Sequence, residues 1–239
     1  MKVTNIKLFK NVFTELSKIC DEIQFQIHED ELQSAFLNRA RTVFCKCTIK
    51  CLETTSEEEG NSFAMDIHEF GNVLKNIKNT GELSLQLKEA YVDITYASGK
   101  SKKKYRIGLL NEDDVESREP PKLEYDMFIV SSDFIKESLN DIKLVSTVSC
   151  VFKTEDDYFM ISLKEPTMML MEYENSIQVG AELTEQQSTY TMELLNLFLN
   201  LKEINQEINI GFQTDYPLKL LITNDDATVE GIVAPRLGE

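Results

Sequence analysis

The strongest constraint on the fold is a pattern of four amphipathic segments, each followed by several short runs of alternating hydrophobic and polar residues. In the four segments apolar residues recur every three to four positions, which is typical of a helix with one buried face. The segments begin near residues 6, 67, 132 and 191, so roughly 60 residues separate one from the next. This order predicts four helix-and-strand repeats grouped into two similar halves, and an unrelated α+β arrangement is the alternative.

The predicted helices run from Ile6 to Cys20, Ile67 to Lys78, Ser132 to Ile142 and Thr191 to Leu201. Ser131, Ser132 and Asp133 are candidate N-cap residues for the third helix. Alternating runs between the helices predict strands at Glu82 to Leu87, Tyr91 to Tyr96, Lys104 to Leu110, Thr147 to Phe152, Tyr158 to Leu163, Glu207 to Gln213, Leu218 to Thr223 and Thr228 to Val233.

The middle of the chain carries a linker signal. Residues 111–123 read NEDDVESREPPKL, which is acidic and polar. Pro120 and Pro121 exclude a helix or a central strand at that point. We therefore predict an N-terminal domain over residues 1–112, a connecting linker over 113–123 and a C-terminal domain over 124–239.

Composition narrows the class of protein. The chain has 239 residues, of which 42% are hydrophobic, enough for two modest cores, and its formal net charge is −16. Such a charge argues against a simple basic nucleic-acid binder, although basic residues gathered on one surface would be compatible with it. The first residues lack an apolar signal segment, and no run reaches the ~18 apolar residues of a membrane span. The expectation is a soluble, intracellular protein with no membrane partner.

Catalytic and metal-binding patterns are weak. The five cysteines form no CxxC pair, and Cys45 and Cys47 alternate on one face of an expected strand, which favours buried thiols over a metal site with His28 or His68. The glycines never form a phosphate-binding motif, and two histidines offer no convincing triad. The sequence therefore predicts no catalytic residue, no metal and no cofactor.

Several stretches together resemble one known family. They are Asp215 to Leu220, Ile232 to Leu237, Leu8 to Leu16, Phe70 to Leu85 and Leu194 to Phe198. The Pro-Leu strand and the later Ala-Pro-Arg-Leu ending are similar to the C-terminus of the proliferating cell nuclear antigen (PCNA) family of DNA sliding clamps. The first helix, the second helix with its next strand, and the fourth helix are similar to the corresponding elements of that family.

The resemblance implies an α+β DNA-clamp fold: two similar domains, each with two inner helices and outer antiparallel β-sheets, assembling as three subunits into a six-domain ring. It implies that the strand at Lys104 to Leu110 pairs with a neighbouring subunit's strand near Ile177 to Leu183, which would also cover an open sheet edge. The implied function is that of a non-enzymatic DNA polymerase processivity factor. The alternatives are a subunit of a checkpoint-type or heterotrimeric clamp, or an acidic interaction scaffold that does not encircle DNA.

For duplex DNA, the resemblance implies lysines on the helices that contact phosphates without reading sequence. The first two helices carry an excess of lysine, whereas lysine and acid balance on the third and fourth. The dense basic run Lys100 to Lys104 is interpreted as a solvated turn. The expected DNA-facing residues are Lys7, Lys10, Lys75, Lys78, Lys136 and Lys143.

For protein partners, the resemblance implies a pocket beneath the linker that receives short peptides with aromatic anchors. Expected partners are DNA polymerase, clamp loader, nuclease and ligase, in the nucleus of a eukaryote or the cytoplasm and nucleoid of an archaeon. The linker before Pro120 is less apolar than is usual in the family, and some pocket residues could simply belong to the core. The expected pocket residues are Leu37, Arg41, Thr42, Phe44, Leu123, Pro217, Ile232, Ala234 and Pro235.

Overall fold

The computed structural model describes residues 1–52, 60–112, 122–146, 148–155, 158–163, 172–176, 184–201 and 207–237, with the backbone alone for residues 52 and 172–176. The chain forms two compact units that interleave in sequence. The N-terminal unit comprises Met1–Ala40, Phe44–Glu119 and Asn224–Val229, and the C-terminal unit comprises Arg41–Val43, Pro120–Thr223 and Glu230–Glu239. The domain limits expected from the linker stay a prediction.

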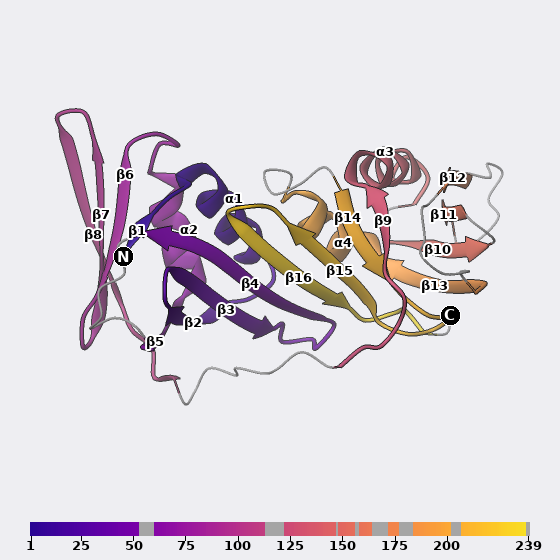
Figure 1. Ribbon diagram of the computed structural model, residues 1–239, viewed down its shortest axis with the longest axis horizontal. Coiled ribbons are helices and arrows are strands. Elements are labelled where there is room, and N and C mark those ends of the chain that lie inside the picture. Colours follow the sequence, from indigo (N-terminus) through magenta and orange to yellow (C-terminus); the bar gives the residue numbers. More distant parts are fainter. Residues whose placement is uncertain are drawn as a thin grey trace. The chain divides into compact units, whose positions relative to one another are not determined.

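The N-terminal unit combines two helices with antiparallel strands (Figure 1). One series of paired strands runs β8-β7-β6-β1-β4, and β4 continues through β3 and β2 to β5. The elements are β1 (Lys2–Val3), α1 (Ile6–Leu16), β2 (Glu22–His28), β3 (Glu31–Leu37), β4 (Val43–Leu52), β5 (Ser62–Asp66), α2 (Ile67–Lys75), β6 (Glu82–Leu87), β7 (Tyr91–Ser98) and β8 (Ser101–Gly108).

The C-terminal unit repeats this composition. One sheet has the order β12-β11-β10-β13, and a second series of paired strands runs β16-β15-β14-β9. The elements are β9 (Phe128–Ser131), α3 (Ser132–Ile142), β10 (Ser149–Glu155), β11 (Tyr158–Ser162), β12 (Glu172–Ser176), β13 (Gln186–Thr191), α4 (Met192–Leu199), β14 (Glu207–Gly211), β15 (Leu218–Thr223) and β16 (Ala227–Val233). The predicted α+β class, with two helices and antiparallel sheet in each unit, is confirmed.

The helix stripes predicted the helices well, and one of the three N-cap candidates for the third helix occupies the N-cap position. Three helices begin at the predicted residue and α4 begins one residue later, while α1, α2 and α4 end earlier than predicted. Ser131 is the N-cap of α3, but its side chain makes no capping hydrogen bond. The strand expected from Lys104 in fact begins at Ser101, so most of the Lys100–Lys104 run lies on β8 rather than in a turn.

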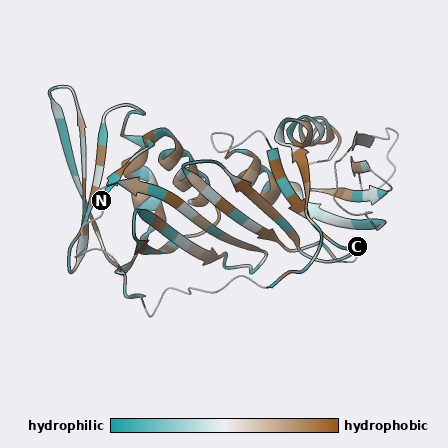
Figure 2. Cartoon of the chain, viewed as in Figure 1, coloured by the Kyte–Doolittle hydropathy of each residue, from teal (hydrophilic) through white to brown (hydrophobic). Residues whose placement is uncertain are grey.

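The cores are aromatic in both units. In the N-terminal unit, Phe13 contacts Phe9, Phe25 and Phe70 with ring centroids 4.7, 5.3 and 5.5 Å apart, which joins α1 and α2 to β2. Edge-to-face pairs of this kind add to the stabilisation from buried area. In the C-terminal unit, Phe152, Phe159, Phe212, Phe128 and Tyr190 form a comparable cluster. Figure 2 shows hydrophobic and hydrophilic residues alternating along the strands that cover these cores.

Glycine allows close packing where α4 meets β16. A Cβ on Gly231 would lie 2.4 Å from ring atoms of Phe198, so any side chain here would collide with the buried ring of α4. Gly71 similarly brings α2 close to Ser17, beyond the end of α1. All five cysteines are buried thiols, as predicted for Cys45 and Cys47. None of the described helices is long and apolar enough to cross a membrane.

Candidate nucleic-acid interface and docking surface

Helix α1 turns a hydrophobic stripe inward and a lysine-bearing side outward. Asn5 caps its N-terminus, because the side-chain oxygen accepts a hydrogen bond from the backbone N–H of Leu8 at 3.0 Å. Lys7 is exposed, whereas Lys10 is half-buried and its ammonium group donates a hydrogen bond to the carbonyl of Ile77. Lys10 therefore ties α1 to the segment that follows α2.

Helix α2 ends in a concentration of positive charge. Lys75 in its last turn and Lys78 just beyond it are both exposed. The carbonyl of Asn76, which is the C-cap, accepts a hydrogen bond from the ammonium of Lys103 at 3.1 Å. Cations at a helix C-terminus interact favourably with its dipole and with its unpaired carbonyls. Of the predicted DNA-facing residues, the structure brings Lys10, Lys75 and Lys78 to this one end of α2.

Sequence reasoning missed Lys103, because it interpreted the lysine run as a solvated turn. On β8 the buried residue is Ile107, so Lys103 falls on the same side of the strand as Ile107, and Lys102 and Lys104 fall on the opposite side. The strand alternation that places Ile107 inward was the signal that could have assigned Lys103 to the helix side.

The helices of the C-terminal unit are less basic. Lys136 is half-buried on α3, and Lys143 is exposed at its C-cap. Helix α4 carries Glu193 and no basic residue. The folded helices are in fact net acidic, because α3 carries Asp133, Glu137 and Asp141 against Lys136, and α4 carries Glu193 without a base.

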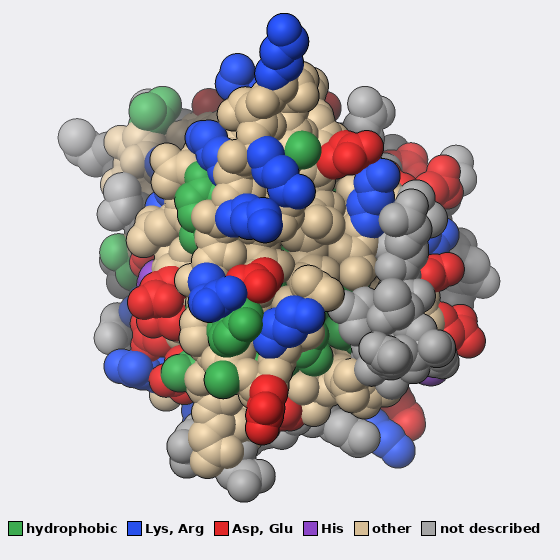
Figure 3. Space-filling view, turned by 90° about the vertical axis from the view of Figure 1, so that its left-hand side faces the viewer, with side chains coloured by type: hydrophobic (Ala, Val, Ile, Leu, Met, Phe, Trp, Pro, Cys, Tyr) green, Lys and Arg blue, Asp and Glu red, His purple; other side chains and the backbone are tan. Residues whose placement is uncertain are grey.

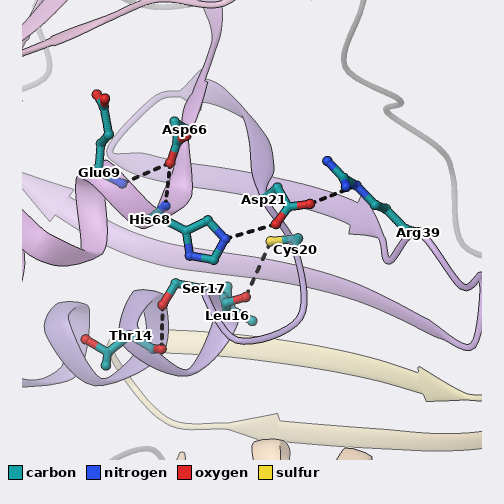
Figure 4. Close-up of polar contacts among 9 residues, drawn as sticks. All are labelled: Thr14, Leu16, Ser17, Cys20, Asp21, Arg39, Asp66, His68 and Glu69. Carbon is teal, nitrogen blue, oxygen red and sulfur yellow. Dashed lines mark hydrogen bonds and ion pairs between the residues drawn. The ribbon is translucent and has the colours of Figure 1, made fainter.

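An exposed ion-pair network secures the loop after β3 in the N-terminal unit (Figure 4). Asp21 lies 2.8 Å from Nε of Arg39 and 3.0 Å from Nε2 of His68. The hydrogen bond from His68, with further support from the charge of Arg39, lowers the pKa of the Asp21 carboxyl. Asp66 caps α2 by accepting from the backbone N–H groups of His68 and Glu69 at 2.7 and 2.9 Å.

The C-terminal unit gathers part of the predicted peptide pocket around its chain end. The backbone N–H of Ala234 donates to the carbonyl of Thr42 at 2.8 Å, and that of Arg236 donates to Thr189 at 2.8 Å. Thr42, Pro217, Ala234 and Pro235 are half-buried, so each retains an accessible surface.

Two tyrosines that the sequence did not assign to the pocket lie beside Pro217. The hydroxyl of Tyr125 donates to the carbonyl of Pro217 at 2.5 Å, and burial raises the pKa of that hydroxyl, which keeps it protonated as a donor. The Tyr125 ring meets Tyr216 edge to face with centroids 6.5 Å apart. Tyr216 is 49% exposed. We call Leu123, Tyr216, Pro217, Ala234 and Pro235 the tail surface.

The remaining predicted pocket residues differ in accessibility. Phe44 and Ile232 are buried at 4% and 5% exposure, so they act as core residues in the chain as described. Arg41 is exposed and has a positive φ of 56°, and Leu37 is half-buried at the end of β3. Leu37 and Phe44 belong to the N-terminal unit, whereas Arg41 and Ile232 belong to the C-terminal unit.

Comparison with known proteins identifies the fold and shows which proteins the chain resembles. No protein-family model matches the chain. The DNA polymerase sliding clamp of Methanobrevibacter smithii is 25% identical over 99% of this chain and 97% of its own length. The chain therefore resembles DNA polymerase sliding clamps over nearly its whole length. A solved structure of A. fulgidus PCNA bound to the C-terminal region of FEN-1 covers 100% of both chains with a TM-score of 0.87 and 17% identity.

A second solved structure, the PCNA2–PCNA3 complex of Sulfolobus tokodaii, matches with a TM-score of 0.83 and 19% identity, and the match covers 99% of this chain and 98% of that chain. The clamp fold accounts for both units at once, because the match spans the full length. The predicted strand near Ile177 to Leu183 and the linker residues 113–121 lie outside the described residues.

Proposed function

We propose that the chain is a subunit of a ring-shaped DNA sliding clamp that encircles duplex DNA, acts as a DNA polymerase processivity factor and docks replication and repair proteins. The observation that carries the proposal is the similarity to sliding clamps over essentially the whole chain, in sequence and in fold. The ring works topologically: a closed ring cannot leave the DNA without opening, so a bound polymerase stays tethered. No catalytic residue is proposed.

Charge distribution supports the DNA contact. The chain has a net charge of −16, yet Lys10, Lys75 and Lys78 gather at one end of α2. Exposed lysines on helices give a sequence-independent attraction to phosphates, while the acidic remainder repels DNA elsewhere. We propose Lys7, Lys75 and Lys78 as the main phosphate contacts, with Lys136 and Lys143 as weaker ones and Lys10 partly engaged with the protein.

Partner docking is proposed at the tail surface, because it combines an exposed aromatic ring with half-buried apolar residues, as peptide hot spots require. The FEN-1 region bound to the A. fulgidus relative makes a nuclease peptide the natural first candidate. Polymerase, clamp loader and ligase are proposed to use the same surface.

A heteromeric ring is the second candidate. Helix α4 has no basic residue, so a ring of identical subunits would have little positive charge on that helix. The Sulfolobus tokodaii relatives form a PCNA2–PCNA3 complex. A ring that combines this chain with homologous subunits, including a checkpoint-type ring, would supply the charge from the other members.

Primer extension by the polymerase of the same organism tests the function. With the clamp loader and ATP present, the chain is expected to lengthen products on a primed circular template and to lose this effect on a linear template with free ends. Equal stimulation on both templates would contradict encirclement and favour an acidic scaffold. If the chain by itself does not stimulate the polymerase but does so once homologous subunits are added, the heteromeric ring is established.

A further inference from the structure

The segment that follows α2 is held by side chains from three other elements of the N-terminal unit. We call residues 76–81 the exit segment. Three of its carbonyl groups accept hydrogen bonds from side chains that are distant in sequence. The ammonium of Lys10 on α1 donates to Ile77, the ammonium of Lys103 on β8 donates to Asn76 at 3.1 Å, and the hydroxyl of Tyr96 on β7 donates to Thr80 at 2.7 Å.

Packing adds to these hydrogen bonds and leaves the exit segment little freedom. Ile77 is 2% exposed, and its backbone N–H donates to the carbonyl of Leu74 at 3.1 Å. Gly81 has a positive φ of 114°, and a Cβ there would lie 2.4 Å from the carbonyl oxygen of Ala97 on β7. The exit segment is therefore fixed against α2 at its start and against β7 at its end.

The lysines around this helix end fall into two pairs. The ammonium groups of Lys10 and Lys103 are engaged with carbonyls of the exit segment. Lys75 and Lys78 are exposed, and neither forms an ion pair with another residue that the structure describes. Lys75 directly precedes the exit segment and Lys78 lies within it, so fixing the segment also fixes the backbone from which both exposed side chains project.

A fixed backbone strengthens binding by exposed lysines. A flexible loop loses conformational freedom when its side chains meet phosphates, and this loss reduces affinity. A segment that is already ordered loses only the freedom of the side chains themselves. The ring of Tyr96 is 3% exposed, so its contribution to binding at this surface has to act through the segment that its hydroxyl holds.

We infer that Tyr96 and Lys103 are positioning residues for the contact with DNA. By holding the exit segment, they keep the ammonium groups of Lys75 and Lys78 where phosphates can reach them. In this role neither positioning side chain contacts a phosphate. The inference rests on the proposed function and deepens it, because it names residues that prepare the DNA contact from behind the helix.

Tyr96→Phe tests the inference because it removes the hydrogen bond to Thr80 and leaves the charge of the chain unchanged. Unchanged charge matters here. Figure 3 shows Lys and Arg side chains gathered on the face of the N-terminal unit that carries β6 to β8, so losing any lysine there also lowers the general attraction for DNA. In fluorescence anisotropy, Tyr96→Phe should weaken binding to a short duplex by roughly threefold at low salt.

Tyr190→Phe is the matched control. Tyr190 is buried in the C-terminal unit, and its hydroxyl donates to the carbonyl of Tyr216 at 2.8 Å. The substitution therefore removes a hydrogen bond of the same kind at a place that carries none of the proposed DNA lysines. Duplex affinity should be unchanged in this variant, and circular dichroism should show both tyrosine variants folded.

A double-mutant cycle separates positioning from direct contact. Lys103→Met should weaken DNA binding more than Lys102→Met, which removes the same charge from the opposite side of β8. With Lys75→Ala and Lys78→Ala already in place, the two methionine variants should have equal effects and Tyr96→Phe should have almost none. Positioning predicts this loss of effect because no exposed lysine remains to be positioned, whereas independent contacts would stay additive.

Three outcomes overturn the inference. The first is a folded Tyr96→Phe variant that binds DNA like the wild type, and the second is an effect of that variant that persists in full without Lys75 and Lys78. The third is equal weakening by Lys103→Met and Lys102→Met in the otherwise unchanged chain, a comparison that also decides if Tyr96→Phe does not fold.

These outcomes are distinct from failure of the proposed function. If Lys75→Ala with Lys78→Ala still weakens binding while the positioning variants do not, the proposed DNA contact stands without this inference. If duplex affinity does not depend on Lys75 and Lys78 at all, the proposed contact is contradicted together with the inference.

Discussion

The ammonium group of Lys10 on α1 donates a hydrogen bond to the backbone carbonyl of Ile77, which follows α2. The same segment holds the Asn76 carbonyl that accepts from Lys103 on β8. One short stretch therefore receives cations from a helix and from a strand, and its geometry depends on both. Lys10 was predicted from sequence to face DNA; the structure gives it a structural contact as well.

Replacing Lys10 by Met is expected to destabilise the protein by about 1.5 kcal/mol, because the Ile77 carbonyl loses a charged donor in a half-buried position. For a chain of this size the melting temperature should fall by about 4 °C. Differential scanning calorimetry measures the change. Lys78→Met is the control: its exposed side chain should alter stability by less than about 0.5 kcal/mol. If both substitutions change the stability equally, the proposed structural role of Lys10 is contradicted.

Lys75 and Lys78 are expected to carry DNA attraction. The double substitution Lys75→Ala with Lys78→Ala should weaken binding to a short duplex by about tenfold at 0.1 M salt. It should also lower the slope of log affinity against log salt by about 0.9 for each phosphate that is no longer neutralised. Fluorescence anisotropy at several salt concentrations measures both quantities. Lys50 and Lys88 are also exposed, and their double alanine variant is the matched control. If both variants reduce affinity and slope alike, the attraction belongs to overall charge rather than to α2.

The Asp21 network predicts a small acid-dependent loss of stability. Because the folded pKa of Asp21 is lowered, the stabilisation is present above the carboxyl's ordinary value of 3.8 and is lost as the pH falls through the lower folded value. The network is exposed, so we expect about 0.5 kcal/mol. Urea unfolding should show Asp21→Asn less stable than the wild type at pH 7, and the difference should vanish once the pH falls below the lowered folded pKa of Asp21. Asp126→Asn, at another exposed carboxylate, is the matched control at pH 7 and should leave the free energy of unfolding unchanged.

The sequence predicted the helices, because their positions follow from the local spacing of apolar residues. The inward stripes of α1 and α3 place Phe9, Phe13, Ile135 and Leu139 in the cores, and those helices were located from this spacing alone. The hairpin of β2 and β3 was missed, because its turn has a positive φ of 51° at Glu29, where glycine or asparagine would have signalled the reversal.

The candidate sites depended on contacts between distant residues, which periodicity does not reveal. Lys103 was interpreted as part of a turn, whereas its partner, the Asn76 carbonyl, places it beside α2. Tyr125 and Tyr216 are far apart in sequence and meet through the Pro217 carbonyl and through their rings. Phe44 and Ile232 carried the family resemblance of the pocket but are buried, and burial depends on the whole unit around them.

The tail surface predicts a specific hot spot at Tyr216. Its ring is 49% exposed and is held against Tyr125, so little side-chain freedom would be lost when a peptide binds. Tyr216→Ala should weaken binding of a synthetic peptide from the C-terminal region of the organism's FEN-1 nuclease by at least about tenfold in isothermal titration calorimetry.

Tyr158 provides the matched control for that measurement. It is 47% exposed on β11 of the same unit, so Tyr158→Ala removes a similar exposed ring from another place. Peptide affinity should be unchanged in this variant, and circular dichroism should show both variants folded. Unchanged affinity in Tyr216→Ala, or an equal reduction in Tyr158→Ala, would place peptide docking away from the tail surface. A selective reduction at Tyr216 would assign the aromatic anchor of the peptide to the ring pair that the Pro217 carbonyl helps to hold.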